Sequence, residues 1–150
     1  MKRLAWVVLL IACAGCVTVK IPKYLKDESP YKKKFYASFD KTFAATKQAL
    51  QDTGWKVTET SSPAVFEQSP SATEKGQKEI LIFTEVRQTP LILSSRYMGV
   101  NVYLRSADNS TDVEIRYISV MPMLFKNAET YKNDLVVNKI FERISQLLGK

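Results

Sequence analysis

The sequence contains no histidine, and its only two cysteines, Cys13 and Cys16, lie near the start of the chain. Without histidine there is no Ser-His-Asp or Cys-His arrangement, no His-ligated metal site and no imidazole acid or base. The rest of the chain has no thiol for catalysis or zinc binding, and it cannot form an internal disulfide. None of the five glycines belongs to a G-x-G-x-x-G or P-loop pattern. We therefore expect a protein that is not an enzyme and holds no cofactor and no metal.

Carboxylates are the remaining candidates for catalysis. The charge of the chain gives little indication that it binds nucleic acid. A glycosidase-like hydrolase would need a converging carboxylate pair, but acidic residues on strand edges and solvent-facing positions are common. The formal net charge of +7 includes Lys2 and Arg3, and the other basic residues are scattered apart from one tract. We expect no nucleic-acid partner. The acidic candidates on or beside predicted strands are Glu79, Glu85, Asp112 and Glu114.

The first sixteen residues are typical of a bacterial export signal. A basic start, Met1-Lys2-Arg3, precedes the apolar run Leu4 to Ala12. Nine apolar residues are too few for a membrane-spanning helix, which needs about 20, but they fit the apolar region of a signal peptide. The segment ends in Leu-Ile-Ala-Cys-Ala-Gly-Cys, residues 10–16, which resembles the lipobox that precedes a lipid-attachment cysteine.

Two cysteines compete for the lipid. Cys16 follows the small pair Ala14-Gly15 and gives the signal a better length, whereas Cys13 has the better residue, Leu10, at the third position back. We favour Cys16, with Cys13 as the alternative. We expect a signal peptide over residues 1–15, a lipidated N-terminus and flexible tether over 16–34, and one α+β domain over 35–150.

The tether is predicted from its proline and lysine content. Pro22 and Pro30 interrupt any helix, and no hydrophobic period is sustained. Basic residues outnumber acidic ones, so contact with an anionic membrane surface is one interpretation of this tract, but a solvated linker is the favoured one. The lysines of the tract are Lys20, Lys23, Lys26, Lys32, Lys33 and Lys34.

From residue 35 the patterns alternate between strand and helix. A short strand at 35–37 precedes a helix with Ser38 as N-cap and Gly54 at its end. Two short strands follow, the second around Val65-Phe66, and then three longer strands over 78–87, 97–105 and 112–120. A final amphipathic helix carries Val136, Ile140, Ile144 and Leu147. The order β-α-β-β-β-β-β-α predicts an antiparallel sheet of about five strands with both helices on one face, a helix-grip-like α+β fold.

One stretch resembles a known family. Over Phe39 to Val57, an amphipathic helix with Ala45 and Ala49-Leu50 passes through Gly54-Trp55-Lys56-Val57 into a strand. This pattern is similar to the opening of the small domains of BamC-type lipoproteins, which belong to the outer-membrane β-barrel assembly machine. The resemblance implies a helix-grip domain in the bacterial envelope and a role in outer-membrane assembly.

The connection at 88–96 and the segment after residue 120 are unusually apolar for loops. Both are expected at the same end of the sheet, and exposed apolar loops are costly unless a partner, a lipid or the final helix covers them. We therefore predict a partner-binding surface here, although burial under the final helix or extension of the strands is an equal alternative. Its predicted residues are Pro90, Leu91, Ile92, Leu93, Met121, Met123, Leu124 and Phe125.

Together these features predict a membrane-anchored, non-catalytic scaffold that binds another envelope protein. The residue after either cysteine, Val17 or Ala14, is not aspartate. By the rule for enteric lipoproteins, we expect the periplasmic face of the outer membrane. The alternative function is a carrier or sensor of a small apolar ligand or lipid held between sheet and helix.

Overall fold

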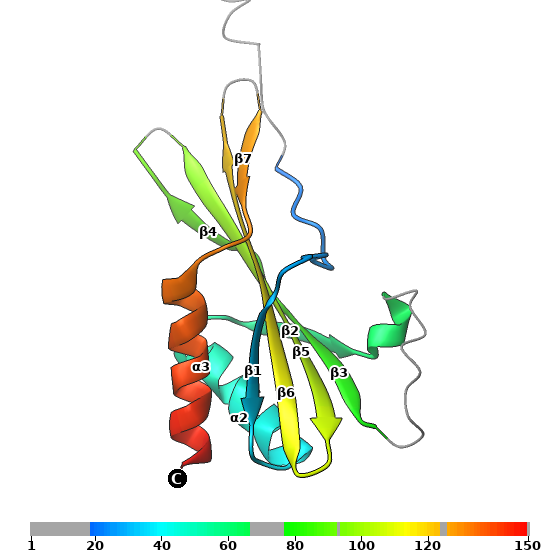
Figure 1. Cartoon of the computed structure of the whole chain (residues 1–150). Coiled ribbons are helices and arrows are strands. Elements are labelled where there is room, and N and C mark those ends of the chain that lie inside the picture. The colour runs from blue at the N-terminus through cyan, green and yellow to red at the C-terminus, as the bar shows by residue number, and fades with distance from the viewer. Residues whose placement is uncertain (1–18, 67–76, 93, 124–125, 150) are drawn as a thin grey trace, which may run out of the picture.

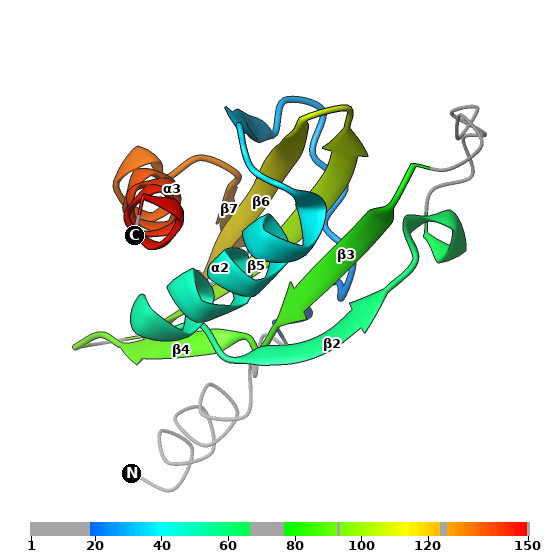
Figure 2. The same ribbon diagram turned by 90° about the horizontal axis from the view of Figure 1, so that it is seen from below.

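The computed structural model describes residues 19–66, 77–92, 94–123 and 126–149, and over these it shows an α+β fold. A seven-stranded antiparallel sheet carries both helices on one face (Figures 1 and 2), which confirms the predicted fold class. The elements are β1 (Tyr31–Phe35), α2 (Phe39–Asp52), β2 (Val57–Ser61), the 3-10 turn η1 (Pro63–Val65), β3 (Glu79–Thr84), β4 (Arg87–Pro90), β5 (Ser95–Ala107), β6 (Ser110–Pro122), β7 (Asn127–Thr130) and α3 (Asp134–Leu148).

The two longest strands, β5 and β6, form the centre of the sheet. They pair from Tyr97 opposite Val120 to Ala107 opposite Ser110, so Asp108 and Asn109 make the predicted turn. The strand order is β1-β6-β5-β3-β2. At the other end of the long strands, β4 pairs with β5 and β7 pairs with β6, which gives two projecting hairpins (Figure 1).

The main core fills the space between this sheet and the helices. Alternate residues of β5 and β6, such as Val102 and Ile115, meet α2 and α3 in one buried cluster. The stripe predicted for the last helix faces this cluster, with Ile140 and Ile144 fully buried. Asn133 caps α3 by accepting a hydrogen bond from the Val136 amide at 3.1 Å.

Local signals set the limits of α2 as the sequence predicts. Ser38 is the N-cap, with extended backbone, and the helix ends at the C-cap Thr53. Gly54 follows with φ of +83°, a left-handed conformation that glycine adopts without steric cost. The turn then brings the fully buried Trp55 under the helix end, where the Arg87 guanidinium lies 4.8 Å from its ring centre.

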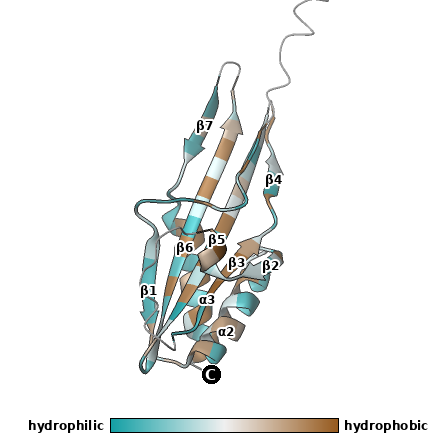
Figure 3. Ribbon diagram, turned by 90° about the vertical axis from the view of Figure 1, so that its right-hand side faces the viewer, coloured by the Kyte–Doolittle hydropathy of each residue, from teal (hydrophilic) through white to brown (hydrophobic). Residues whose placement is uncertain are grey.

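Three strand predictions differ from the structure. The first strand is Tyr31–Phe35, not residues 35–37, and the segment around Val65-Phe66 is the 3-10 turn η1. The short strands β4 and β7 extend the sheet to seven strands. Both are polar: β7 is largely hydrophilic in Figure 3, so no hydrophobic alternation marks it in the sequence.

The N-terminal segment, residues 19–27, packs on the sheet face opposite the helices. Leu25 is buried against Ile118 and Val120, with Val19 and Ile21 beside them. Downstream, Tyr31–Phe35 pairs with β6 over five residues. Residues 19–34 therefore differ from the predicted flexible tether, because a lysine-rich, proline-containing stretch is here held by contacts with residues far away in the sequence.

Candidate functional site

The end of the sheet that carries the two hairpins is the candidate functional site, and we call it the apolar end. The Leu91 amide donates to the Ser94 carbonyl at 2.8 Å, and the Met123 amide donates to the Lys126 carbonyl at 3.0 Å. Short hairpin connections favour Gly, Asn and Asp, whereas the sequence between these bonded residues is Ile-Leu in the first hairpin and Leu-Phe in the second.

The described residues at these tips are exposed. Ile92 is 99% exposed, Leu91 41% and Met123 52%. Leaving an isoleucine side chain in water forgoes roughly 1.5–3 kcal/mol of burial free energy, so the arrangement is costly for a surface with no partner. The strands extend into the predicted loops, but α3 does not cover the exposed tips.

The structure describes some of the predicted partner-binding residues and not others. Pro90, at the end of β4, is exposed, while Met121 in β6 is half-buried. Leu91, Ile92 and Met123 form the exposed tips. Leu93, Leu124 and Phe125 lie outside the described residues, as do both candidate lipid-attachment cysteines, Cys16 and Cys13.

Apolar contacts position the N-terminal segment near this end. Val19 and Ile21 pack beside Ile118 and Val120 of β6. A Cβ atom at Gly99 would lie 3.4 Å from Cγ2 of Ile21 and 3.4 Å from Cγ2 of Ile118. The missing side chain at Gly99 therefore makes room for the segment to lie directly on β5.

Two polar residues of the central strands hold the same segment. The Leu25 amide donates to Oδ1 of Asn101 at 2.7 Å. The buried Arg116 donates to the hydroxyl of Tyr24 and, at 3.4 Å, to the Leu25 carbonyl. Asn101 is 3% exposed and Arg116 7%.

No motif in the sequence marks Asn101 or Arg116 as a binding residue. The available signal is their polarity at the centre of two otherwise apolar strands, a position where a buried polar group needs a partner. The partners could not be identified from the sequence, because Leu25 and Asn101 are 76 positions apart.

Tyr24 and Lys23 of the N-terminal segment make further contacts. Tyr24 stacks on Phe66 with ring centres 5.4 Å apart, and Phe66 meets Phe83 edge-on at 5.1 Å. Lys23 lies 5.1 Å from the Phe83 ring centre and pairs with Glu59 at 2.5 Å. These contacts bind the segment to β2 and β3 as well as to the central strands.

Basic side chains surround the apolar end. Lys20, Arg96 and Lys126 are exposed near the hairpins or the N-terminal segment. Residues 86–98 contain two basic and no acidic residues, and residues 119–130 contain only Lys126 and Glu129 as charged residues. Basic residues therefore outnumber acidic ones in the two segments that carry the apolar tips.

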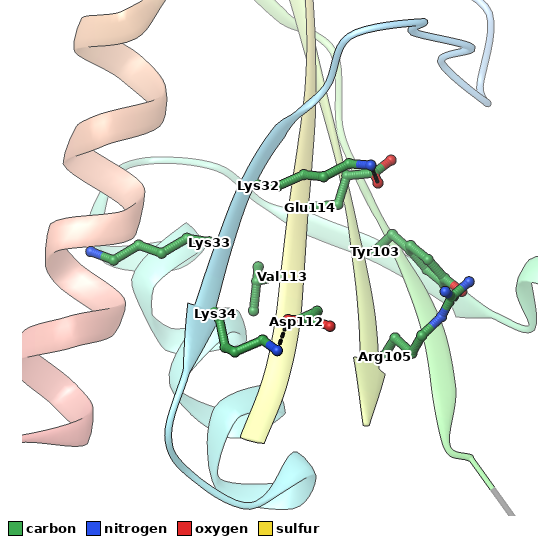
Figure 4. A pocket seen from close by; sticks show the side chains of 8 residues that line it. All are labelled: Lys32, Lys33, Lys34, Tyr103, Arg105, Asp112, Val113 and Glu114. Atoms are coloured by element: carbon green, nitrogen blue, oxygen red, sulfur yellow. Dashed lines mark hydrogen bonds and ion pairs between the residues drawn. The ribbon is translucent and has the colours of Figure 1, made fainter. Parts of the chain in front are cut away.

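A charged groove lies toward the opposite end of the sheet (Figure 4). Lys32 pairs with Glu114 at 3.6 Å, and Lys34 pairs with Asp112 at 3.7 Å. The groove has a volume of about 350 Å³. A mainly charged lining does not match the apolar cavity that a carrier needs. The lining residues are Lys32, Lys33, Lys34, Tyr103, Arg105, Asp112, Val113 and Glu114.

Tyr103, on the wall of this groove, is held in its neutral form. Burial raises the pKa of Tyr103, and a hydrogen bond to Glu79 raises it further, whereas Arg105 lowers it. Arg105 donates to the Tyr103 hydroxyl at 2.8 Å and pairs with Glu79 at 2.7 Å. Tyr103, Arg105 and Glu79 thus bind one another, and the Tyr103 hydroxyl releases its proton less readily than an exposed tyrosine does.

Each of the four candidate carboxylates has a basic partner. Glu85 pairs with Lys56 at 3.1 Å and Glu114 with Arg116 at 2.6 Å, while Glu79 and Asp112 have the partners given above. Over the described ranges there is no cluster of three or more Asp, Glu, Cys or His residues able to hold a metal ion. In the same part of the chain, no helix is long and apolar enough to cross a membrane.

Comparison with known proteins gives no match: neither a protein-family model nor a curated protein sequence matches the chain. The resemblance to BamC-type lipoproteins therefore stays a prediction from the sequence.

Proposed function

We propose that this chain is a lipid-anchored protein of the bacterial envelope that acts by binding another envelope component through its apolar end, without catalysis. The lipobox-like sequence before Cys16 supports the anchor, with Cys13 as the alternative attachment site. The resemblance to BamC-type lipoproteins favours a protein partner, the periplasmic face of the outer membrane and outer-membrane assembly.

The observation that carries this proposal is the exposure of the hairpin tips. Ile92 is almost completely exposed in a domain whose other large apolar side chains mostly pack into three buried clusters. Exposed apolar side chains that recur at one end of a molecule are typical of a contact surface. The charged groove makes a weaker candidate, because its acidic residues already pair with its lysines.

The carrier alternative requires an apolar cavity between the sheet and the helices. The space between the sheet and the helices is filled by the main core cluster. Two of the described surface grooves are lined in part by exposed charged side chains.

Two measurements test the proposal. The intact mass of the protein extracted from membranes should show acyl groups on a chain that begins at Cys16 or Cys13. A photo-crosslinking residue at position 92 should give a distinct product with a protein or a lipid of the envelope in living cells, and the same residue at position 36 should not. Tyr36 is a suitable control because it is 88% exposed and lies at the other end of the sheet. A chain without acyl mass, or equal crosslinking at both positions, would contradict the proposal.

A further inference from the structure

Along the length of β5 and β6, the start of the N-terminal segment lies at about the same height as the apolar end. Val19 packs against the cluster that contains Val120 of β6, and Met123 lies three residues beyond Val120 along the chain. Cys16 precedes Val19 by three residues in the sequence. Three extended residues span at most about 10 Å, and the six from Cys13 at most about 20 Å. An acylated cysteine can therefore lie level with the hairpin tips while the segment stays on the sheet.

From this geometry we infer that the apolar end is a membrane-contacting surface, which places both hairpin tips in the phospholipid bilayer that holds the protein's own lipid anchor. This inference rests on the proposed lipid anchor and identifies the component that the apolar end contacts.

The order of side chains at this end matches a bilayer surface. Ile92, Leu91 and Met123 are apolar and outermost. Arg96 lies further back, opposite Thr89, while Lys126 flanks the second tip opposite Met123, and Lys20 is exposed on the N-terminal segment. Interfacial membrane contacts combine the same two features, apolar side chains at the acyl boundary and basic ones at the level of anionic headgroups.

The separation of the two tips favours a bilayer over a protein partner. The two hairpins splay apart in Figure 1, so the apolar end consists of two separate projections. A stable protein interface buries about 800 Å² on each partner with close shape complementarity. A fluid bilayer accommodates two separate insertions without a preformed complementary surface.

The test uses the full acylated chain in vesicles of phosphatidylethanolamine and phosphatidylglycerol. The variant Ile92→Cys carries an environment-sensitive fluorophore, and Tyr36→Cys carries the same fluorophore as the matched control. The wild-type chain treated with the fluorophore gives the background from Cys13 and Cys16. We expect a shift of emission to shorter wavelength at position 92, with quenching by lipids brominated near the headgroup, and neither effect at position 36.

The intact mass of each sample separates the possible failures. A chain without acyl mass contradicts the proposed anchor, and the inference with it. An acylated chain whose label at position 92 keeps its aqueous emission overturns the inference alone. If that label stays aqueous while a crosslinker at position 92 captures one protein in cells, the apolar end is a protein-binding surface instead.

Charge provides a second test that does not alter the tips. Arg96→Glu combined with Lys126→Glu should reduce the quenching at position 92 in these vesicles, because both side chains would then repel the anionic lipid. The control is Lys139→Glu, an exposed position on α3 away from the hairpins. Equal quenching in the double variant and in the control would contradict the assignment of the basic side chains to the headgroups.

Discussion

Single polar residues decide whether the N-terminal segment stays on the sheet. Asn101 is almost fully buried, and its side chain accepts the amide hydrogen bond of the equally buried Leu25. The cost of losing such a partner comes mainly from the buried group that is left without one.

We predict that Asn101→Leu lowers the free energy of unfolding by about 1–3 kcal/mol, because the Leu25 amide then lacks an acceptor. Urea unfolding followed by circular dichroism measures this change. Asn138→Leu, at an exposed position on α3, is the control and should leave the unfolding free energy nearly unchanged. Equal effects of the two substitutions would show that the Leu25 contact contributes nothing.

The raised pKa of Tyr103 should make the free energy of unfolding depend on pH in the alkaline range. Because burial raises its pKa above the ordinary value of 10.0, the unfolded chain releases this proton at lower pH than the folded chain does. The stabilisation is therefore complete below pH 10 and is lost as the pH rises further. The difference in unfolding free energy between the wild type and Tyr103→Phe should shrink as the pH rises from about 10 to 12. A constant difference over this range would be inconsistent with the raised pKa.

At the scale of elements, the N-terminal segment depends on a close approach at Gly99. We predict that Gly99→Val destabilises the protein by roughly 1–3 kcal/mol, because the branched side chain must displace Ile21 or Ile118. Hydrogen exchange should become faster at the Leu25 amide. Gly99→Ala is the graded control with a smaller effect, since a single Cβ meets both neighbours at 3.4 Å. Unchanged exchange in the valine variant would show that the segment is not held at this point.

Elements with local signals could be predicted, and elements held by distant contacts could not. Ser38 and Gly54 mark the two ends of α2 in the sequence, and the apolar stripe of α3 faces the core as its spacing indicates. The alternation in β5 and β6 likewise predicts the centre of the sheet. These signals lie within a few residues of the structure that they specify.

The N-terminal segment and the short strands have no such signal. Lysines and prolines are frequent in residues 19–34, so the pattern indicates a linker, whereas contacts with distant residues such as Asn101 and Arg116 turn it into a bound segment. The polar strands β4 and β7 form because β5 and β6 extend past the main sheet and offer unpaired edges. The sequence predicts the apolar end as a partner-binding surface, but only the structure shows that Ile92 is exposed.

For the whole molecule, the short connection between the lipid anchor and the N-terminal segment should control contact of the tips with the membrane. Inserting a flexible Gly-Ser stretch between Thr18 and Val19 lowers the effective concentration of the tips at the bilayer, which falls as a linker lengthens. We predict reduced quenching of the label at position 92, with an unchanged unfolding free energy. The same stretch added after Lys150 is the control, and an insertion without effect at either site would show that the tips find the membrane independently of the anchor.

The attachment of the N-terminal segment also has a mechanical consequence. A pull on the lipid anchor acts along residues 19–27, and it loads the apolar contacts of Val19 and Ile21 and then the hydrogen bonds of Leu25 with Asn101 and Arg116. These two residues lie in the middle of β5 and β6, which pair with each other from Tyr97 to Ala107 on one side and from Ser110 to Val120 on the other. Force from the membrane would therefore enter the domain through its most extensively hydrogen-bonded strands, instead of peeling an edge strand from the sheet.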